Sequence, residues 1–345
     1  MVTEQYLPIA TESLIIGSSI GCDLYLSPKK DKFVLYWKAN QILTGEVEKE
    51  LLRENLSNLF IRVEERKQYL RYVESNVTNI ISNKTIPSTK KAKIVYDVAS
   101  NLMQDVLDEP RAGQNIERAK NWVANAVNYI LRDTNSITNL LSIVSYDYYT
   151  YTHSINVAII GLLFARYLSV EVCNFNPLGV GLLLHDVGKT TIDPKILNKQ
   201  GKLTEEEFEA VKKHPDEGFR LLKEAGEISE ESLAVVLQHH ENYDCTIRKG
   251  YPKGIEGDEI SYFGKVAHII DVYDALTTRR AYAEAKQPFP ALKIMKEEML
   301  YHFQKELFIE FIKFLGPSGG LETRKVGSRN EPFYKRMSSG KIKST

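Results

Sequence analysis

The feature that most constrains this chain is an apolar run that ends in a histidine and an aspartate. Residues 182–189 read Leu-Leu-Leu-His-Asp-Val-Gly-Lys, so His185 and Asp186 close a segment that otherwise favours burial. Burying an imidazole and a carboxylate costs free energy unless a charged group compensates them, and a metal ion is the usual partner. Adjacent helical residues point about 100° apart, so the pair could bind one ion, or Asp186 could bridge two. A capping or core pair is the alternative at this point.

The composition bounds the class of protein. The 345 residues suffice for two domains, and a hydrophobic content of 43% with 26% charged residues is ordinary for a globular chain. The net charge of zero gives no field that would attract a nucleic acid polymer. Three cysteines without CxxC spacing argue against a zinc ribbon and for a reducing compartment. Without a signal-peptide pattern or an apolar run of about 18 residues, we expect a cytoplasmic protein with no transmembrane segment.

Residues 1–83 predict a small, mostly β domain. Turn-forming residues separate short apolar runs, and a helix and a strand complete the pattern; the runs are 6–9, 14–16, 23–26 and 33–36, the helix is 46–55 and the strand is 59–63. Apolar residues at helical spacing then predict a connecting helix that reaches residue 81. The domain is either a packing module or a regulatory, partner-docking module, and the sequence leaves both open.

After a predicted linker at 83–91, the apolar pattern stays helical to residue 315. We expect helices at 95–106, 116–131, 137–144, 154–168, 178–185, 205–225, 230–240, 262–276 and 290–304. No alternating strand pattern interrupts them, so residues 84–315 predict an all-α bundle and the chain is mainly α. Residues 316–345 are basic and poor in apolar residues, which predicts a flexible tail. That tail is either simply solvated or able to touch nucleic acid or anionic lipid.

Five of the seven histidines sit where a helical bundle could bring them together: His153, His185, His214, His239 and His240. Asp271 and Asp274 interrupt an apolar helical run, and a buried carboxylate needs a partner, which a shared metal supplies. Asp274 could instead orient a histidine from outside the ligand set. His268 and His302 are interpreted as structural or exposed.

The motifs resemble a known family. They are HDVGK at 185–189, HPDEG at 214–218, HHENYD at 239–244, GYP at 250–252 and DVYDALTTRRAY at 271–282. In this order they are similar to the HD-GYP phosphodiesterases, a bacterial signalling branch of the HD metal-dependent phosphohydrolases. The resemblance covers about residues 146–316, and five matches in the family's order make it specific. It implies an HD-type helical bundle for the second domain.

The resemblance also implies a pair of metal ions. One ion would be held by His153, His185, Asp186 and Asp271, and the other by Asp186, His214, His239 and His240. A mixed nitrogen and oxygen ligand set without thiolate suits iron first and manganese next.

The activity that the resemblance implies is hydrolysis of cyclic di-GMP, or a related cyclic dinucleotide, to linear pGpG; whether a second step continues to GMP is left open. A hydroxide bridging the two metals would attack the phosphodiester. Asp186 and Lys189 are expected to be catalytic, and Lys189, Arg280 and Tyr251 to contact substrate. The alternative is a catalytically weak or inactive receptor for the dinucleotide. A protein partner could dock on the first domain or the GYP loop, and a homodimer is compatible with the sequence.

Four departures from the family pattern concern the surroundings of this site. Tyr149 stands where some members place a glutamate for a third metal, so we expect two ions. The segment between Asp244 and Gly250 is about three residues longer than the family's, Cys245 replaces a glycine, and Ala281 replaces a proline. These changes leave the metal ligands intact and alter the loop that faces substrate. Metal binding is therefore predicted more firmly than turnover.

Overall fold

The computed structural model describes residues 5–29, 32–54, 56–144, 150–278 and 285–316. It divides into two compact units, Met1–Asn101 and Leu102–Thr345. Helix α3 (Ser88–Asp108) runs across this division. The predicted boundary between residues 83 and 84 lies just before that helix and stays a prediction. The predicted flexible tail, apart from Gly316, lies outside the described residues.

The first unit contains a four-stranded antiparallel sheet in the order β1-β4-β2-β3. Its elements are β1 (Tyr6–Ala10), β2 (Leu24–Lys29), β3 (Lys32–Trp37), α1 (Gly45–Arg53), β4 (Asn58–Arg62) and α2 (Arg66–Ser82). The prediction of a strand at 14–16 is wrong. The Ile15 N–H donates a hydrogen bond of 2.8 Å to the Tyr72 hydroxyl and not to the backbone of a neighbouring strand. The predicted linker is also too long, since its residues from Ser88 onward belong to α3.

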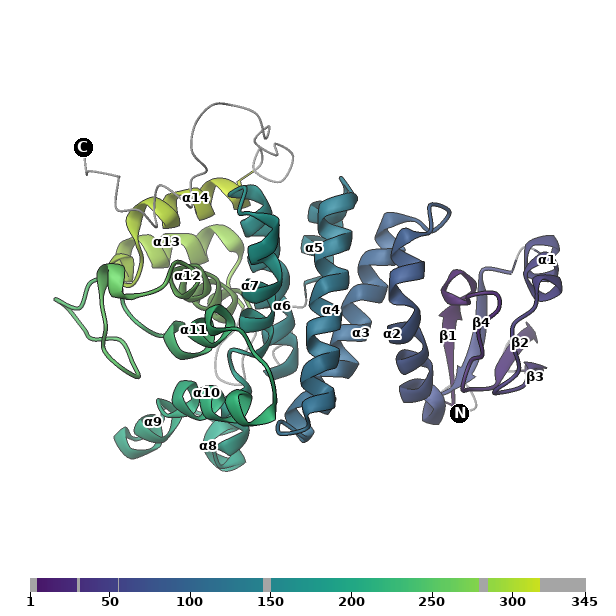
Figure 1. Ribbon diagram of the computed structural model, residues 1–345, viewed down its shortest axis with the longest axis horizontal. Coiled ribbons are helices and arrows are strands. Elements are labelled where there is room, and N and C mark those ends of the chain that lie inside the picture. Colours follow the sequence, from purple (N-terminus) through teal and green to yellow (C-terminus); the bar gives the residue numbers. More distant parts are fainter. Residues whose placement is uncertain (1–4, 30–31, 55, 145–149, 279–284, 317–345) are drawn as a thin grey trace. The chain divides into compact units, whose positions relative to one another are not determined.

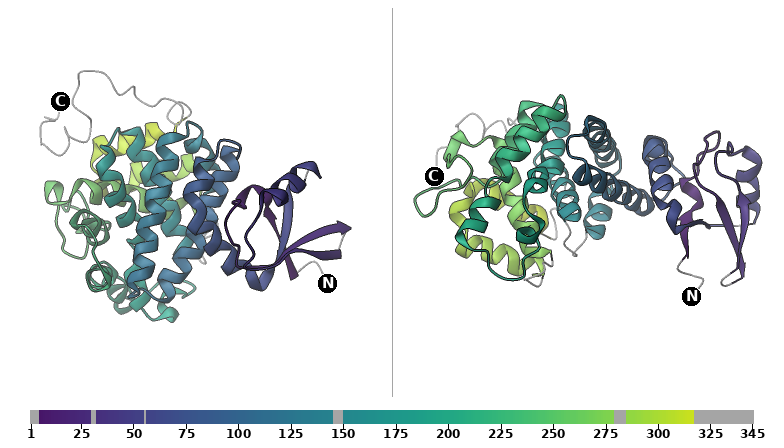
Figure 2. Two further views of the ribbon diagram at one scale, coloured as in Figure 1. Left: turned by 45° about the vertical axis from the view of Figure 1, so that its right-hand side comes forward. Right: turned by 90° about the horizontal axis from the view of Figure 1, so that it is seen from below.

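The second unit is all-α, as expected, and α7 (Phe175–Leu184) lies at its centre (Figures 1 and 2). The other helices are α4 (Gly113–Arg132), α5 (Ser136–Ile143), α6 (Thr150–Tyr167), α8 (Pro194–Leu197), α9 (Glu205–Val211), α10 (His214–Ala225), α11 (Glu230–Gln238), α12 (Tyr262–Thr277), α13 (Pro288–Glu298) and α14 (Lys305–Leu315). Helix α7 contacts α4, α6 and α11. It is apolar almost all round, as a helix covered on every side must be.

Two expected helices are divided in the structure. The pattern at 205–225 forms α9 and α10, which are separated at Lys212 and Lys213, so His214 opens a helix rather than lying within one. Pro215 is tolerated there because the first turn of a helix leaves its N–H groups without intrahelical partners. The pattern at 290–304 ends earlier, at Glu298, and α14 follows separately. In the part of the chain that the structure describes, no helix is long and apolar enough to cross a membrane.

Candidate metal centre

The predicted ligand residues lie close together, some at the ends of helices and some in helix interiors. The C-terminal end of α7 provides His185 and Asp186, and the start of α10 provides His214. The residues that follow α11 are His239 and His240, while α6 and α12 contribute His153 and Asp271 from their interiors. The side chain of His240 is 20% exposed, and the other six are buried.

One group of donor atoms is formed by His153, His185 and Asp271. The two histidine Nε2 atoms are 3.2 Å apart, and Asp271 Oδ1 lies 3.1 Å from that of His153 and 3.8 Å from that of His185. Asp186 Oδ2 approaches the same two nitrogens at 3.6 and 3.5 Å. The four residues predicted for the first ion therefore surround one point.

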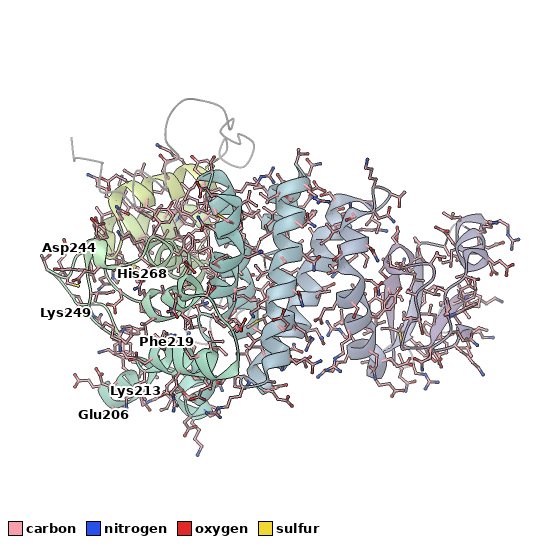
Figure 3. The ribbon with its side chains drawn as sticks, in the orientation of Figure 1. Glu206, Lys213, Phe219, Asp244, Lys249 and His268 are labelled. Carbon is pink, nitrogen blue, oxygen red and sulfur yellow. The ribbon has the colours of Figure 1, made fainter. Side chains whose placement is uncertain are left out.

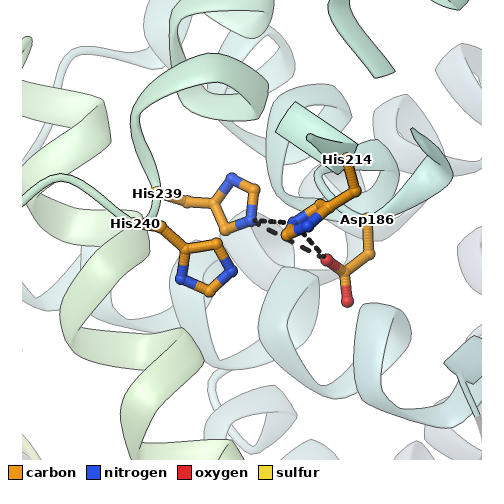
Figure 4. Close-up of side chains that lie close together, drawn as sticks. All are labelled: Asp186, His214, His239 and His240. Carbon is orange, nitrogen blue, oxygen red and sulfur yellow. Dashed lines mark hydrogen bonds and ion pairs between the residues drawn. The ribbon is translucent and has the colours of Figure 1, made fainter. Parts of the chain in front are cut away.

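The second group of donor atoms is formed by Asp186, His214, His239 and His240 (Figure 4). The Nε2 atoms of His214 and His239 are 3.1 Å apart, and they lie 3.2 and 3.7 Å from Asp186 Oδ1. Asp186 thus directs one carboxylate oxygen to each group. This is the arrangement expected of a bridging ligand.

The imidazoles are oriented before any ion binds. His185, His214 and His239 each donate Nδ1–H to the backbone carbonyl three residues earlier, at 2.7, 2.7 and 2.8 Å. His153 donates its Nδ1–H to Asp274 Oδ2 at 2.7 Å. In a neutral imidazole the other ring nitrogen then carries a lone pair, so these four Nε2 atoms are all acceptors that point at the two groups.

Burial lowers the pKa values of His185, His214 and His240, while neighbouring groups lower those of Asp186 and Asp271. Desolvation lowers the pKa of His185 to about 3 and also lowers that of His214. Burial by itself would raise the pKa of Asp186, but the Lys189 ammonium and His185 hold it well below its ordinary value. The centre therefore combines uncharged nitrogen acceptors with negative oxygens.

This donor set fits metal ions. Two ligands about 2.1 Å from one ion are about 3.0 Å apart at a right angle and about 3.4 Å apart at the tetrahedral angle, close to the separations above. Asp186 Oδ1 is buried and has no hydrogen-bond partner, because the Nε2 of His214 that faces it is itself an acceptor. Facing lone pairs repel unless a cation lies between them. A cation at each group would satisfy these atoms.

The residues around the ligands include two that the sequence interpretation did not single out, Asn156 and Glu241, together with His268, which it interpreted as structural or exposed. Asp274 orients His153, as foreseen, and its other oxygen accepts a 3.0 Å hydrogen bond from buried Asn156. His268, labelled in Figure 3, donates its Nδ1–H to the His239 carbonyl at 2.5 Å, and this bond ties α12 to the end of α11. Its position three residues before Asp271 on one helix was the available signal.

Glu241 is the second residue that the sequence interpretation did not single out, and it fixes the loop that follows the histidine pair. Its buried Oε1 accepts hydrogen bonds from the backbone N–H groups of Lys253 and Gly254, at 2.7 and 3.2 Å. A Cβ at Gly250 would collide with the backbone of Glu241 and Asn242, so only glycine permits this close approach. The GYP segment is therefore held directly against the metal ligands.

The residues predicted to contact substrate have different outcomes. The Tyr251 ring stacks on that of His240, with centroids 4.6 Å apart, which brings it to the centre despite the longer loop. Lys189 Nζ forms an ion pair with Asp186 Oδ2, and its side chain is 17% exposed. Arg280 lies outside the described residues, as do Tyr149 and Ala281. The substrate contacts of Tyr251, Lys189 and Arg280 stay predictions.

Comparison with known proteins agrees with this architecture. Residues 160–307 match the model of the HD domain family, so the chain carries an HD domain. A cyclic di-GMP phosphodiesterase of Pseudomonas aeruginosa is 32% identical over 261 residues, 74% of this chain and 62% of that protein. A 3′3′-cGAMP-specific phosphodiesterase of Vibrio cholerae is 36% identical over 168 residues, 48% of this chain and 35% of that protein. The chain spans less than two thirds of the length of these curated relatives.

Among solved structures, the HDG"Y"P protein of Bdellovibrio bacteriovorus is similar in fold. The TM-score is 0.63 at 21% identity, and the match covers 90% of this chain and 99% of that one. Such an identity supports the fold alone. The HD domain match and the named relatives confirm the expected resemblance to the HD-GYP phosphodiesterases.

Proposed function

We propose that this protein is a metal-dependent phosphodiesterase that hydrolyses cyclic di-GMP or a related cyclic dinucleotide. The observation that carries the proposal is the pair of donor groups that share the two oxygens of Asp186. Relatives named as phosphodiesterases of cyclic di-GMP and of 3′3′-cGAMP support the substrate class. The longer loop before Gly250 keeps a receptor that binds without cleaving as the alternative.

The metal ions are assigned to the two groups of donors. His153, His185 and Asp271 would hold one ion, His214, His239 and His240 the other, and Asp186 both. When bound, the ions supply the positive charge that activates a water molecule and stabilises the reacting phosphate. Donors of imidazole and carboxylate type without thiolate favour iron first and manganese next.

The chain's own residues position and stabilise the substrate. The ammonium of Lys189 lies beside Asp186, where it offsets negative charge that gathers on phosphate oxygens. Burial raises the pKa of Tyr251, so its hydroxyl stays protonated and can donate a hydrogen bond. Arg280 is proposed as a further phosphate contact from its motif. The proposed product is linear pGpG, with a second hydrolysis to GMP as the alternative to a single step. We assign the first unit a regulatory or partner-docking role.

The test is one incubation with a matched control. The protein is purified under conditions that keep iron ferrous, its bound metal is quantified, and cyclic di-GMP is followed by chromatography beside the double variant His185→Ala/Asp186→Ala. Two ions per chain and linear product from the unaltered protein alone would support the phosphodiesterase. Two ions with the dinucleotide bound and intact would identify the receptor. No metal in the unaltered protein would contradict both.

A further inference from the structure

The lengthened segment between Asp244 and Gly250 is anchored at several points along its backbone. The Cys245 N–H donates to Glu256 Oε2 at 3.1 Å, and the Thr246 N–H donates to Asp244 Oδ1 at 2.9 Å. Further along, the Arg248 carbonyl accepts from Asn242 Nδ2 at 2.8 Å. The backbone of this exposed segment is thus held in place, which fixes the position of the Arg248 main chain.

The side chain of Arg248 is a cation without an anionic partner. Lys189 pairs with Asp186 and Lys253 with Asp216, but within the described ranges the Arg248 guanidinium has neither a carboxylate nor a hydrogen bond. Its Cζ lies 5.9 Å above the ring centre of Phe208, within the range of a cation–π contact. That contact orients the planar guanidinium and leaves the N–H groups at its edge free.

A series of aromatic ring contacts links Arg248 to the metal ligand His240. The ring of Tyr251 stacks on His240 at 4.6 Å, and the ring of Phe208 lies edge-on to Tyr251 at 6.3 Å. Arg248 stands beyond Phe208, two rings away from the ligand His240. A base attached to a phosphodiester held by the metal ions would extend along these aromatic rings toward Arg248.

We propose that Arg248 is a specificity-determining residue that reads a guanine of the cyclic dinucleotide. Guanine presents two acceptors, O6 and N7, to which arginine donates a pair of hydrogen bonds, while adenine presents a donor, N6–H₂, in place of O6. Tyr251, whose other face stacks on His240, supplies an aromatic ring for the base to contact. This inference rests on the proposed function and adds a base preference to it.

The test compares three variants of the full-length, metal-loaded enzyme. Arg248→Gln removes the charge, and Arg248→Lys keeps the charge but loses the paired donors. Lys249→Gln is the matched control, because Lys249 is the exposed neighbour on the same loop (Figure 3). The KM for cyclic di-GMP is measured in each, with cyclic di-AMP as a competitor in the same assay, so that its inhibition constant is obtained whether or not it is cleaved.

We expect both Arg248 variants to raise the KM for cyclic di-GMP by about tenfold. Their kcat, metal content and inhibition constant for cyclic di-AMP should stay unchanged, and Lys249→Gln should behave like the unaltered enzyme. Recovery in Arg248→Lys, or an equal loss for both dinucleotides, would overturn guanine reading in favour of simple charge attraction. Unchanged KM in both Arg248 variants would overturn it outright, with the phosphodiesterase intact. An unaltered protein that neither binds nor cleaves cyclic di-GMP would refute the proposed function and this inference together.

Discussion

Replacing Asp274 with asparagine tests whether the orientation of one histidine controls one metal site. Asp274 accepts from His153 Nδ1 at 2.7 Å and from Asn156 Nδ2 at 3.0 Å, both in the buried centre. Asparagine has one side-chain oxygen, so only one of these bonds survives. If it serves His153, two amide nitrogens face each other across the Asn156 contact; if it serves Asn156, His153 loses its acceptor.

The expected effect is confined to the first group of donors. Partners that orient a metal-ligating histidine typically change metal affinity by about 10–100-fold. Each factor of ten corresponds to about 1.4 kcal/mol, so the loss is about 1.4–2.8 kcal/mol. The second group should keep its affinity, because His214 and His239 are oriented by backbone carbonyls that the substitution leaves in place.

The assay is an anaerobic titration with manganese against a chromophoric chelator, which resolves two dissociation constants. The control is Asp105→Asn, which removes the negative charge from the partly buried ion pair with Arg118 (2.9 Å) on helices that contribute no residue to the centre. It should lower the free energy of unfolding by about 1–3 kcal/mol and leave both constants unchanged. Equal weakening of both sites in Asp274→Asn, or of neither, would refute the reasoning.

Three further predictions address the surroundings of the centre. Gly188→Ala places a Cβ that collides with the His214 carbonyl. This variant should lower the free energy of unfolding by about 1–3 kcal/mol and weaken binding of the second ion. Thermal unfolding with and without manganese measures both effects. His268→Asn retains a donor near the His239 carbonyl, so its manganese affinity should exceed that of His268→Leu; equal affinities would contradict a positioning role. In the metal-free protein the lowered pKa values of His185 (about 3) and His302 (about 4) mean that the unfolded chain binds more protons below pH 6.5. Stability should therefore fall as the pH drops from about 6.5 toward 4, by up to about 1.4 kcal/mol per pH unit for each histidine, as measured by urea unfolding.

Much of the fold could be predicted because apolar spacing reports burial directly. The all-α second unit and most of the strands in the first follow from that spacing. The strand expected at 14–16 does not form, because the backbone N–H of Ile15 donates its hydrogen bond to the side chain of Tyr72, a residue distant in the sequence. The break before His214 was missed because the amphipathic pattern continues through it, although Pro215 signals the start of a helix.

The centre was predictable in its ligands but not in its supports. Histidine and aspartate are common metal ligands, so the set of ligand residues around Asp186 could be predicted from the residue types at the motif positions. The partners Asn156 and His268 matter only through distances of 3.0 and 2.5 Å, which single-sequence patterns do not encode. The course of the loop before Tyr251 likewise depends on the carboxylate of Glu241 and the absence of a side chain at Gly250.

The backbone hydrogen bonds of the histidines have a consequence for how the protein tolerates mutation. His185, His214 and His239 each take their orientation from a main-chain carbonyl, and every amino acid at that position supplies the same carbonyl. His153 alone among these four depends on a side chain, that of Asp274. In a library of random substitutions, loss of the first ion should therefore arise at Asp274 and Asn156 as well as at the ligands.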